Sequence, residues 1–254
     1  MPVFPHQLIQ RSEPEGLLQA CAELLEQRLR QRLTQVRPRP LGLATGRTME
    51  PLYLALVARL LAWPPEQLAA LQRSWLSFNL DDYVGLPWGD PAGYRHYMRQ
   101  RLADPLGLSD DQLRLPDGHT KDPAAAAQAY GEALAAAGDV GVQLLGLGSN
   151  GHVGFNEPPC GADAICRVVE LSPATRQQNA ELFGGAAENV PARAITLGLR
   201  EILAAEEIHL VVTGAAKAGI LQRLLDSCPD PGLPASWLRQ HPRVWIWADA
   251  AALA

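Results

Sequence analysis

Hydrophobic residues recur at helical spacing in some stretches of the chain and form short unbroken runs in others. Residues 15–35 carry leucines at helical spacing, with one glycine near the start and no proline, which predicts a long amphipathic helix. Further helices are predicted at residues 49–63, 91–103, 123–138, 173–183 and 217–227. Apolar runs predict strands at residues 40–46, 74–80, 142–148, 164–171, 193–198, 207–214 and 243–249.

Strands that alternate with helices are typical of an α/β fold with a mainly parallel sheet. The chain has no repeat, low-complexity linker or break in composition, so a single domain is expected over residues 1–254. In this interpretation the segment before the first strand holds one helix, and the final alanines fray. Ligands bind such folds at the carboxyl ends of the strands, so the loops there are the places to look for chemistry.

Composition and charge narrow the class of protein. Hydrophobic residues make up 47% and charged residues 19%, which is globular, and the net charge of -5 gives no reason to expect a nucleic-acid partner. No apolar run approaches the roughly 20 residues that span a bilayer, and the start lacks a secretory signal pattern. The four cysteines and the acidic residues show no metal-ligand spacing. A cytoplasmic protein with reduced thiols, no membrane contact and no metal is expected.

The loop after the first predicted strand favours an anion. Thr45, Gly46, Arg47 and Thr48 join a strand to a helix N-terminus, where free N–H groups and the helix dipole attract negative charge. Arg47 can also grip a phosphate through two bonds. The loop matches neither the P-loop nor the dinucleotide fingerprint. The alternative is a tight strand–helix turn with a threonine cap.

Three other loops carry candidate chemistry. Asp81 and Asp82 follow a strand, and two adjacent carboxylates raise one another's pKa, which suits a general base, although a solvated pair is the alternative. His152 lies in a glycine-rich loop, and Glu157 is near enough in sequence to orient its imidazole. Lys217 follows a later strand and either meets the same phosphate or is a surface charge.

Taken together and in this order, LGLATGRT, SFNLDDYVGL, LLGLGSNGHVGFNEP and LVVTGAAK closely resemble the glucosamine-6-phosphate deaminase (isomerase) family, over nearly the whole chain. The related 6-phosphogluconolactonases typically have Asp-Glu-Arg in place of the Asp-Asp-Tyr segment and lack the Phe-Asn-Glu-Pro ending. The resemblance implies a Rossmann-like sheet with helices on both faces. It also implies conversion of an amino-sugar phosphate to fructose 6-phosphate and ammonia, without a cofactor.

The resemblance also implies roles for individual residues. Asp81 matches the base that moves a proton from C2 to C1, with Asp82 as its acidic neighbour. His152 matches the ring-opening histidine and Glu157 its carboxylate partner, and Asn150 stands where some members have aspartate, so Glu157 is expected to orient the imidazole. The residues that match the phosphate site are Thr45, Gly46, Arg47, Thr48 and Lys217.

The chain departs from the family at three places. Arg47 stands where many deaminases have glycine, and Glu181 where an arginine often helps to bind phosphate, so the gain and the loss of charge could offset each other. Arg167 can align with a basic residue of the family's allosteric site, but Val169 replaces the lysine expected there. A monomer or small homo-oligomer is therefore expected rather than an allosteric hexamer.

The alternatives are a 6-phosphogluconolactonase, another sugar-phosphate isomerase, or a non-catalytic sugar-phosphate sensor. A sensor that regulates transcription should carry a helix-turn-helix module ahead of the fold, where this sequence predicts only one long helix.

Overall fold

The computed structural model describes residues 4–254, so the first three residues of the predicted domain lie outside the described part. Its helices are α1 (Pro14–Arg32), α2 (Met49–Leu61), α3 (Pro65–Ser74), α4 (Tyr94–Met98), α5 (Asp104–Leu106), α6 (Pro123–Ala136), α7 (Pro173–Asn179), α8 (Leu199–Leu203) and α9 (Ala218–Asp226). The helical turns of other types are η1 (Arg99–Ala103), η2 (Ala180–Phe183), η3 (Ala187–Asn189), η4 (Ala215–Lys217), η5 (Pro234–Gln240) and η6 (Ala250–Leu253).

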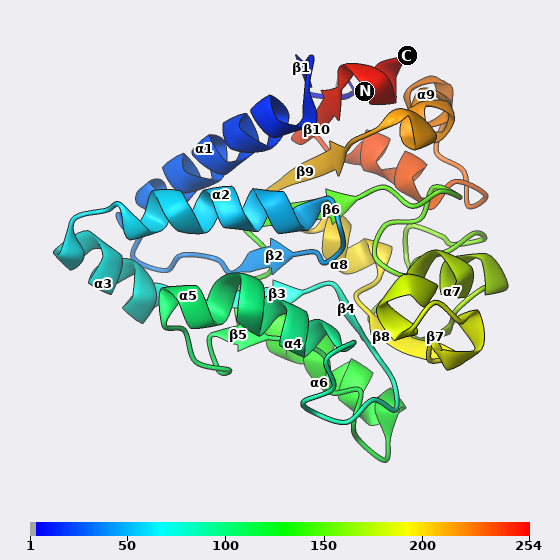
Figure 1. The fold of residues 1–254 in the computed structure, drawn as a ribbon, viewed down its shortest axis with the longest axis horizontal. Helices are drawn as coiled ribbons and strands as arrows, with labels where there is room; N and C mark the ends of the chain where they lie inside the picture. The colour runs from blue at the N-terminus through cyan, green and yellow to red at the C-terminus, as the bar shows by residue number, and fades with distance from the viewer. Residues whose placement is uncertain (1–3) are drawn as a thin grey trace.

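A seven-stranded parallel sheet forms the centre of the molecule, in the order β1-β10-β9-β6-β2-β3-β5 (Figure 1). Its strands are β1 (Gln7–Arg11), β2 (Leu41–Leu43), β3 (Ser77–Asn79), β5 (Leu113–Arg114), β6 (Val142–Gly146), β9 (Glu207–Val212) and β10 (Val244–Asp249). The strands between the edges are almost wholly buried, which is why they read as unbroken apolar runs.

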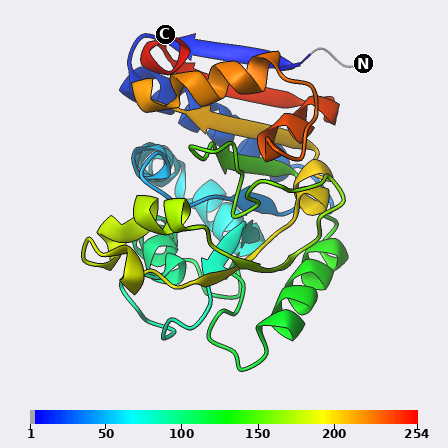
Figure 2. The ribbon, with the colours of Figure 1, turned by 90° about the vertical axis from the view of Figure 1, so that its right-hand side faces the viewer.

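Helices cover both faces of this sheet. Helices α1 and α2 lie on the side that faces the viewer in Figure 1, whereas α6 and α8 lie behind the sheet, and Figure 2 shows the two layers on opposite sides of the strands. The α/β fold with a Rossmann-like, mainly parallel sheet and helices on both faces is therefore confirmed.

A second, three-stranded antiparallel sheet has the order β4-β8-β7 and lies near the carboxyl ends of the large sheet (Figure 1). Its strands are β4 (Asp81–Tyr83), β7 (Arg167–Glu170) and β8 (Arg193–Thr196). The sequence predicted β7 and β8 but not that β4 leaves the large sheet directly after β3. With this change of sheet, the chain passes over the carboxyl ends of the parallel strands.

The two ends of the chain differ from expectation. The expected N-terminal segment with one helix was wrong, because the edge strand β1 precedes α1 and pairs with β10. Its residues are mostly exposed, so no apolar run marks it. The expected fraying of the last alanines was also wrong. Asp249 caps the turn η6 by accepting a hydrogen bond of 2.8 Å from Ala252 N, and Ala252 is fully buried.

The connections place a crevice in the middle of the large sheet. β2 lies between β3 and β6, and the chain leaves β2 toward one side of the sheet and returns to β6 from the other. The loops that follow such neighbouring strands diverge and leave room for a ligand at the carboxyl ends. Within residues 4–254, no helix is long and apolar enough to cross a membrane.

Candidate active site

A cavity of about 620 Å³ opens at the carboxyl ends of β2, β3, β6 and β9, a volume that suits a small metabolite. Most residues predicted from sequence line it together. They are Thr45, Gly46, Arg47, Thr48, Asp81, His152 and Lys217. Asn150, Glu157 and Asp82 lie behind this lining and act on it through other groups.

The loop between β2 and α2 presents donors to the cavity. The Tyr53 hydroxyl donates to the carbonyl of Ala44 at 2.6 Å, and the Tyr97 hydroxyl donates to the carbonyl of Gly46 at 3.0 Å. These carbonyls are thus occupied, whereas the N–H groups of residues 45–48 have no hydrogen-bond partner within the described chain. Together with the dipole of α2, they form a cradle for an oxyanion.

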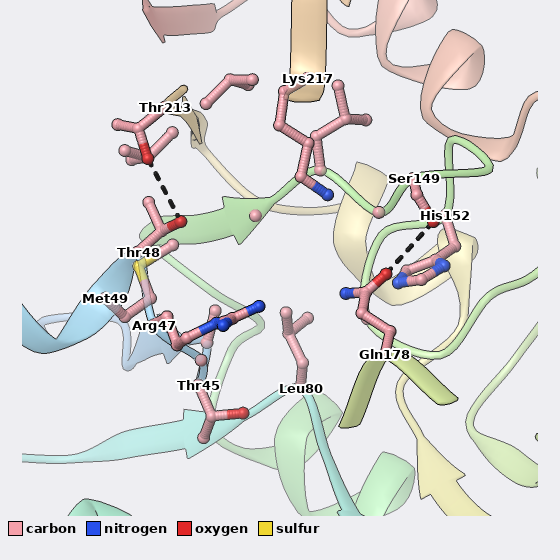
Figure 3. Close-up of a pocket in the computed structure, with 18 of the residues that line it drawn as sticks. Thr45, Arg47, Thr48, Met49, Leu80, Ser149, His152, Gln178, Thr213 and Lys217 are labelled. Carbon is pink, nitrogen blue, oxygen red and sulfur yellow. Dashed lines mark hydrogen bonds between the residues drawn. The ribbon is translucent and has the colours of Figure 1, made fainter. Parts of the chain in front are cut away.

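Two cations point toward this cradle from different elements (Figure 3). Lys217 lies in η4, directly after the turn at Gly214, whose φ of 87° is accessible chiefly to glycine. The buried carboxylate of Asp249 accepts the N–H of Gly214 at 3.0 Å and so fixes the turn. Burial, followed by the charge of Arg47, lowers the pKa of Lys217. An anion bound between the two cations would oppose both effects, because a nearby negative charge favours the charged form of Lys217.

Arg47 also contacts the segment on the far side of the mouth. Its Nη1 lies 3.1 Å from Oε2 of Glu181, and both side chains are about 80% exposed (80% and 79%). Nearby, the Ser149 hydroxyl donates to Oε1 of Gln178 at 3.2 Å, as Figure 3 shows. Exposed ion pairs contribute about 0–1 kcal/mol, so a phosphate that binds Arg47 can displace Glu181.

Asp81 is the acid of the cavity. It begins β4 opposite Thr196 and is only 6% exposed. Burial, followed by the charge of Asp82, raises its pKa to about 8, and the backbone N–H of Phe155 opposes this. A Cβ on Gly154 would lie 3.2 Å from Oδ2 of Asp81, so glycine lets the loop close against the carboxyl. A buried carboxyl with a raised pKa in a cleft is suited to proton transfer.

Asp82 does not line the cavity. Its Oδ1 accepts backbone N–H groups from Tyr83 at 2.8 Å and Tyr94 at 3.2 Å, and burial raises its pKa to about 6. Asp82 therefore anchors the turn after β4, and its charge acts on Asp81 from outside the cavity. Its supporting role in catalysis stays a prediction.

His152 is held as a neutral base. Oδ1 of Asn150 accepts the backbone N–H of His152 at 3.2 Å and lies 2.7 Å from its Nδ1. Because an amide oxygen can only accept, Nδ1 carries the ring hydrogen and donates it, and Nε2 keeps its lone pair. Burial lowers the pKa of His152 to about 4, Glu157 opposes this and Lys217 adds to it. The ring packs where a Cβ of Gly148 would stand.

Glu157 is not the hydrogen-bond partner of His152, contrary to expectation. Its Oε2 accepts the N–H of Ser172 at 3.2 Å, and Ser172 in turn caps α7 by accepting the N–H of Thr175. Oε1 of Glu157 is buried without a partner in residues 4–254. The short Asn150 side chain reaches the ring from two positions away, which leaves Glu157 to tie the loop to α7.

Comparisons with known proteins agree with this arrangement. The family model described as "Glucosamine-6-phosphate isomerases/6-phosphogluconolactonase" matches residues 12–247. The chain belongs to this family. A glucosamine-6-phosphate deaminase of Shouchella clausii is 41% identical over 240 residues, which cover 94% of this chain and 92% of that protein. A deaminase of Rhodopirellula baltica is 42% identical and covers 86% of each chain. The resemblance inferred from the motifs is confirmed.

Solved structures of this family share the fold. A monomeric glucosamine-6-phosphate deaminase superposes with a TM-score of 0.88 at 33% identity, covering 98% of this chain and 100% of that chain. A 6-phosphogluconolactonase from Trypanosoma brucei superposes with a TM-score of 0.76 at 21% identity, covering 97% of each, which supports the fold alone.

The sequence did not single out several residues that shape the site of this family member. From the sequence, Asp249 is only the end of a strand, and Tyr53 and Tyr97 are only helix residues, but all three hold loops of the site. Thr213 faces Thr48, with 3.5 Å between their hydroxyl oxygens. These residues can be recognised as part of the site only from their contacts with distant loops, and a single sequence does not show those contacts. Within the described part of the chain, no group of three or more metal-ligating side chains is placed to hold an ion.

We expect Asn150→Asp to raise the pKa of His152 from about 4 by roughly 1–3 pH units, because a carboxylate in contact with the ring stabilises the imidazolium. NMR titration of the imidazole measures this directly. Asn179→Asp, the same change in a residue that lines the cavity without bonding to His152, serves as the control. An unchanged titration of His152 in the Asn150 variant contradicts the assigned contact.

Proposed function

We propose that this protein is a glucosamine-6-phosphate deaminase, which converts glucosamine 6-phosphate and water to fructose 6-phosphate and ammonia. The observation that carries the proposal is the buried carboxyl of Asp81 in one cavity with an oxyanion cradle. The proposal is supported by relatives named as deaminases that span nearly the whole chain.

The positive charge of an amino-sugar substrate explains how the buried Asp81 can act as a base. At the pH where the free Asp81 carboxyl is mostly protonated, an ammonium at C2 of an amino sugar supplies the opposite charge that lowers its pKa. A neutral sugar phosphate or a lactone offers no such cation. The site is thus better suited to an amino sugar, whose binding generates the base that the reaction needs.

In the proposed reaction, the phosphate binds the N–H groups of residues 45–48 together with Arg47 and Lys217. Nε2 of His152 takes the proton of the C1 hydroxyl and returns it to the ring oxygen, which opens the ring. The Asp81 carboxylate then takes the C2 proton, while O1 of the aldehyde takes a proton from the C2 ammonium. Asp81 returns its proton to C1, which leaves a hydroxyl at C1 and a protonated imine at C2. Water adds to that imine, and ammonia leaves.

Asn150, Glu157 and Asp82 support these steps through the contacts described above. We further propose that the protein works without a cofactor as a monomer or small homo-oligomer, in keeping with the monomeric deaminase of similar fold. The four cysteines are free thiols, which supports a reducing compartment and hence the cytoplasm.

Asp81→Asn tests the proposal most simply, since it keeps the shape of the side chain and removes its basicity. We expect ammonia release from glucosamine 6-phosphate to fall by roughly 10²–10⁴-fold, with little change in substrate affinity. Asp90→Asn, the same change in a half-buried aspartate that does not line the cavity, is the matched control. Near-normal turnover in the Asp81 variant would refute its role as the base.

The pH dependence of kcat/KM should report the same acid. Because Asp81 acts as the ionised base, activity should rise with pH through a limb near pH 8 in the free enzyme. Burial is the larger cause of this raised pKa and the charge of Asp82 is the second. Asp82→Asn removes that charge, while an amide oxygen can still accept the N–H groups of Tyr83 and Tyr94. The limb should therefore move to lower pH, and a limb that stays in place would argue against the coupling.

Arg47 should contribute to binding of the phosphate and little to the chemical step. Arg47→Gly is expected to raise KM and leave kcat nearly unchanged, because the contact is equal in ground and transition states. Glu181→Gln frees Arg47 from its exposed partner and should lower KM by about fivefold at most. Steady-state kinetics of both variants and their double mutant provide the check. An unaltered KM in Arg47→Gly would mean that Lys217 and the backbone hold the phosphate alone.

A further inference from the structure

A second polar cavity lies at the amino ends of the strands of the large sheet, opposite the catalytic cavity. It has a volume of about 230 Å³ and is lined by residues at the amino ends of β6 and β9, just before β10, and along the last turns of α1. The proposed reaction uses none of its residues. Its charged lining consists of Arg28, Arg32, Arg39, Glu206, Glu207 and Arg243.

The helix α1 presents one face to this cavity. Arg28, Gln31 and Arg32 are three and four positions apart, so they lie side by side on the helix surface. Gln35 continues the row just beyond the end of the helix. The spacing of these residues along the sequence therefore places several long donor side chains over the same cavity.

Both glutamates of the lining are already neutralised. The buried Glu207 carboxylate lies 2.6 Å from Nε of Arg28 and 2.9 Å from Nη2 of Arg243. Glu206 lies 3.3 Å from Nε of Arg39. Hydrogen bonds and charge from His209 and Arg28 outweigh the effect of burial and lower the pKa of Glu207 to about 2, so it stays ionised.

Arg32 is the cation that these acids leave uncompensated. Its side chain is only 7% exposed, and within residues 4–254 its Nε and Nη2 atoms are buried without a hydrogen-bond partner. Buried donors without acceptors are costly, and a guanidinium offers parallel N–H groups that fit an oxyanion. Burial also lowers the pKa of Arg32 to about 10, as expected for a cation that lacks a counterion.

We propose that this cavity binds a small phosphate monoester, with Arg32 as its principal ligand. Four arginines and two glutamates give the lining a net charge of +2, which matches a phosphate monoester near neutral pH, whereas a carboxylate would leave one charge unmatched. The NH2 group of Gln31, whose amide oxygen accepts from Arg28, and the arginines already held by Glu207 supply further donors around it. This site is separate from the catalytic cavity, at the other end of the same strands.

Hydrogen exchange of the wild-type protein, followed by mass spectrometry, tests the proposal at the site itself. The probes are inorganic phosphate and glycerol phosphate, titrated against sodium chloride at equal ionic strength. We expect both to slow exchange in the peptide that covers residues 28–35. Tighter half-saturation by glycerol phosphate assigns the site to organic monoesters, and equal values assign it to the phosphate group alone. No protection by either probe, or equal protection by acetate, overturns the proposal.

Arg32→Met should weaken the half-saturation by at least about tenfold, because charge-assisted hydrogen bonds to a buried anion are lost. Arg30→Met is the matched control, since Arg30 lies on the same helix but pairs with Glu26 and Gln67 outside the cavity. Equal protection in Arg32→Met and wild type overturns the assignment. Arg32→Lys, which keeps the charge without the planar fork, should bind with intermediate strength even if the methionine variant fails to fold.

Ammonia release by Arg32→Met in the absence of added phosphate is expected to stay at the wild-type level. Arg32 lies at the opposite end of the strands from Asp81. The binding of phosphate at this cavity and the proposed deaminase activity can therefore each fail without the other.

Discussion

The exclusion of water from one carboxyl group governs the arrangement of the catalytic cavity. Asp81 is buried because the chain leaves the parallel sheet after β3 and pairs at once with β8 in the small antiparallel sheet. The glycine at position 154 then lets the histidine loop close over it. With its pKa raised to about 8, this carboxyl is mostly protonated at neutral pH. In the proposed reaction, the substrate's ammonium is both the group to be removed and the group that favours the ionised carboxylate.

The other donors and bases of the cavity are held in position by hydrogen bonds from side chains that do not line it. Tyrosine hydroxyls occupy the carbonyls of the loop after β2, the Asp249 carboxylate fixes the turn that carries Lys217, and the Asn150 side chain sets the tautomer of His152. Each of these groups orients a donor or base without replacing it. The donors therefore reach the substrate already in place, which lowers the free-energy cost of ordering them during the reaction.

Much of the fold and of the site could be predicted from the sequence, and the failures have physical causes. Buried parallel strands are continuous apolar runs, so β2, β6, β9 and β10 were evident, whereas the exposed edge strand β1 carries no such pattern. The carboxyl ends of parallel strands lie at the same end of a sheet, so the shared cavity of the Thr45–Thr48 loop, Asp81, His152 and Lys217 followed from topology. The pairing of Glu157 with Ser172, of Arg47 with Glu181 and of Asp249 with Gly214 depends on side-chain reach between distant loops, which spacing does not encode.

The central claim is that the positive charge of an amino sugar activates a buried aspartate. It is tested most directly by measuring kcat/KM for glucosamine 6-phosphate, glucose 6-phosphate and 6-phosphogluconolactone with the same wild-type protein. The account predicts that glucosamine 6-phosphate yields ammonia and fructose 6-phosphate in equal amounts. It also predicts that kcat/KM for the two substrates without an amino group is lower by at least about tenfold, the smallest effect of an opposite charge beside a buried acid. Comparable kcat/KM for glucose 6-phosphate or for the lactone would contradict it.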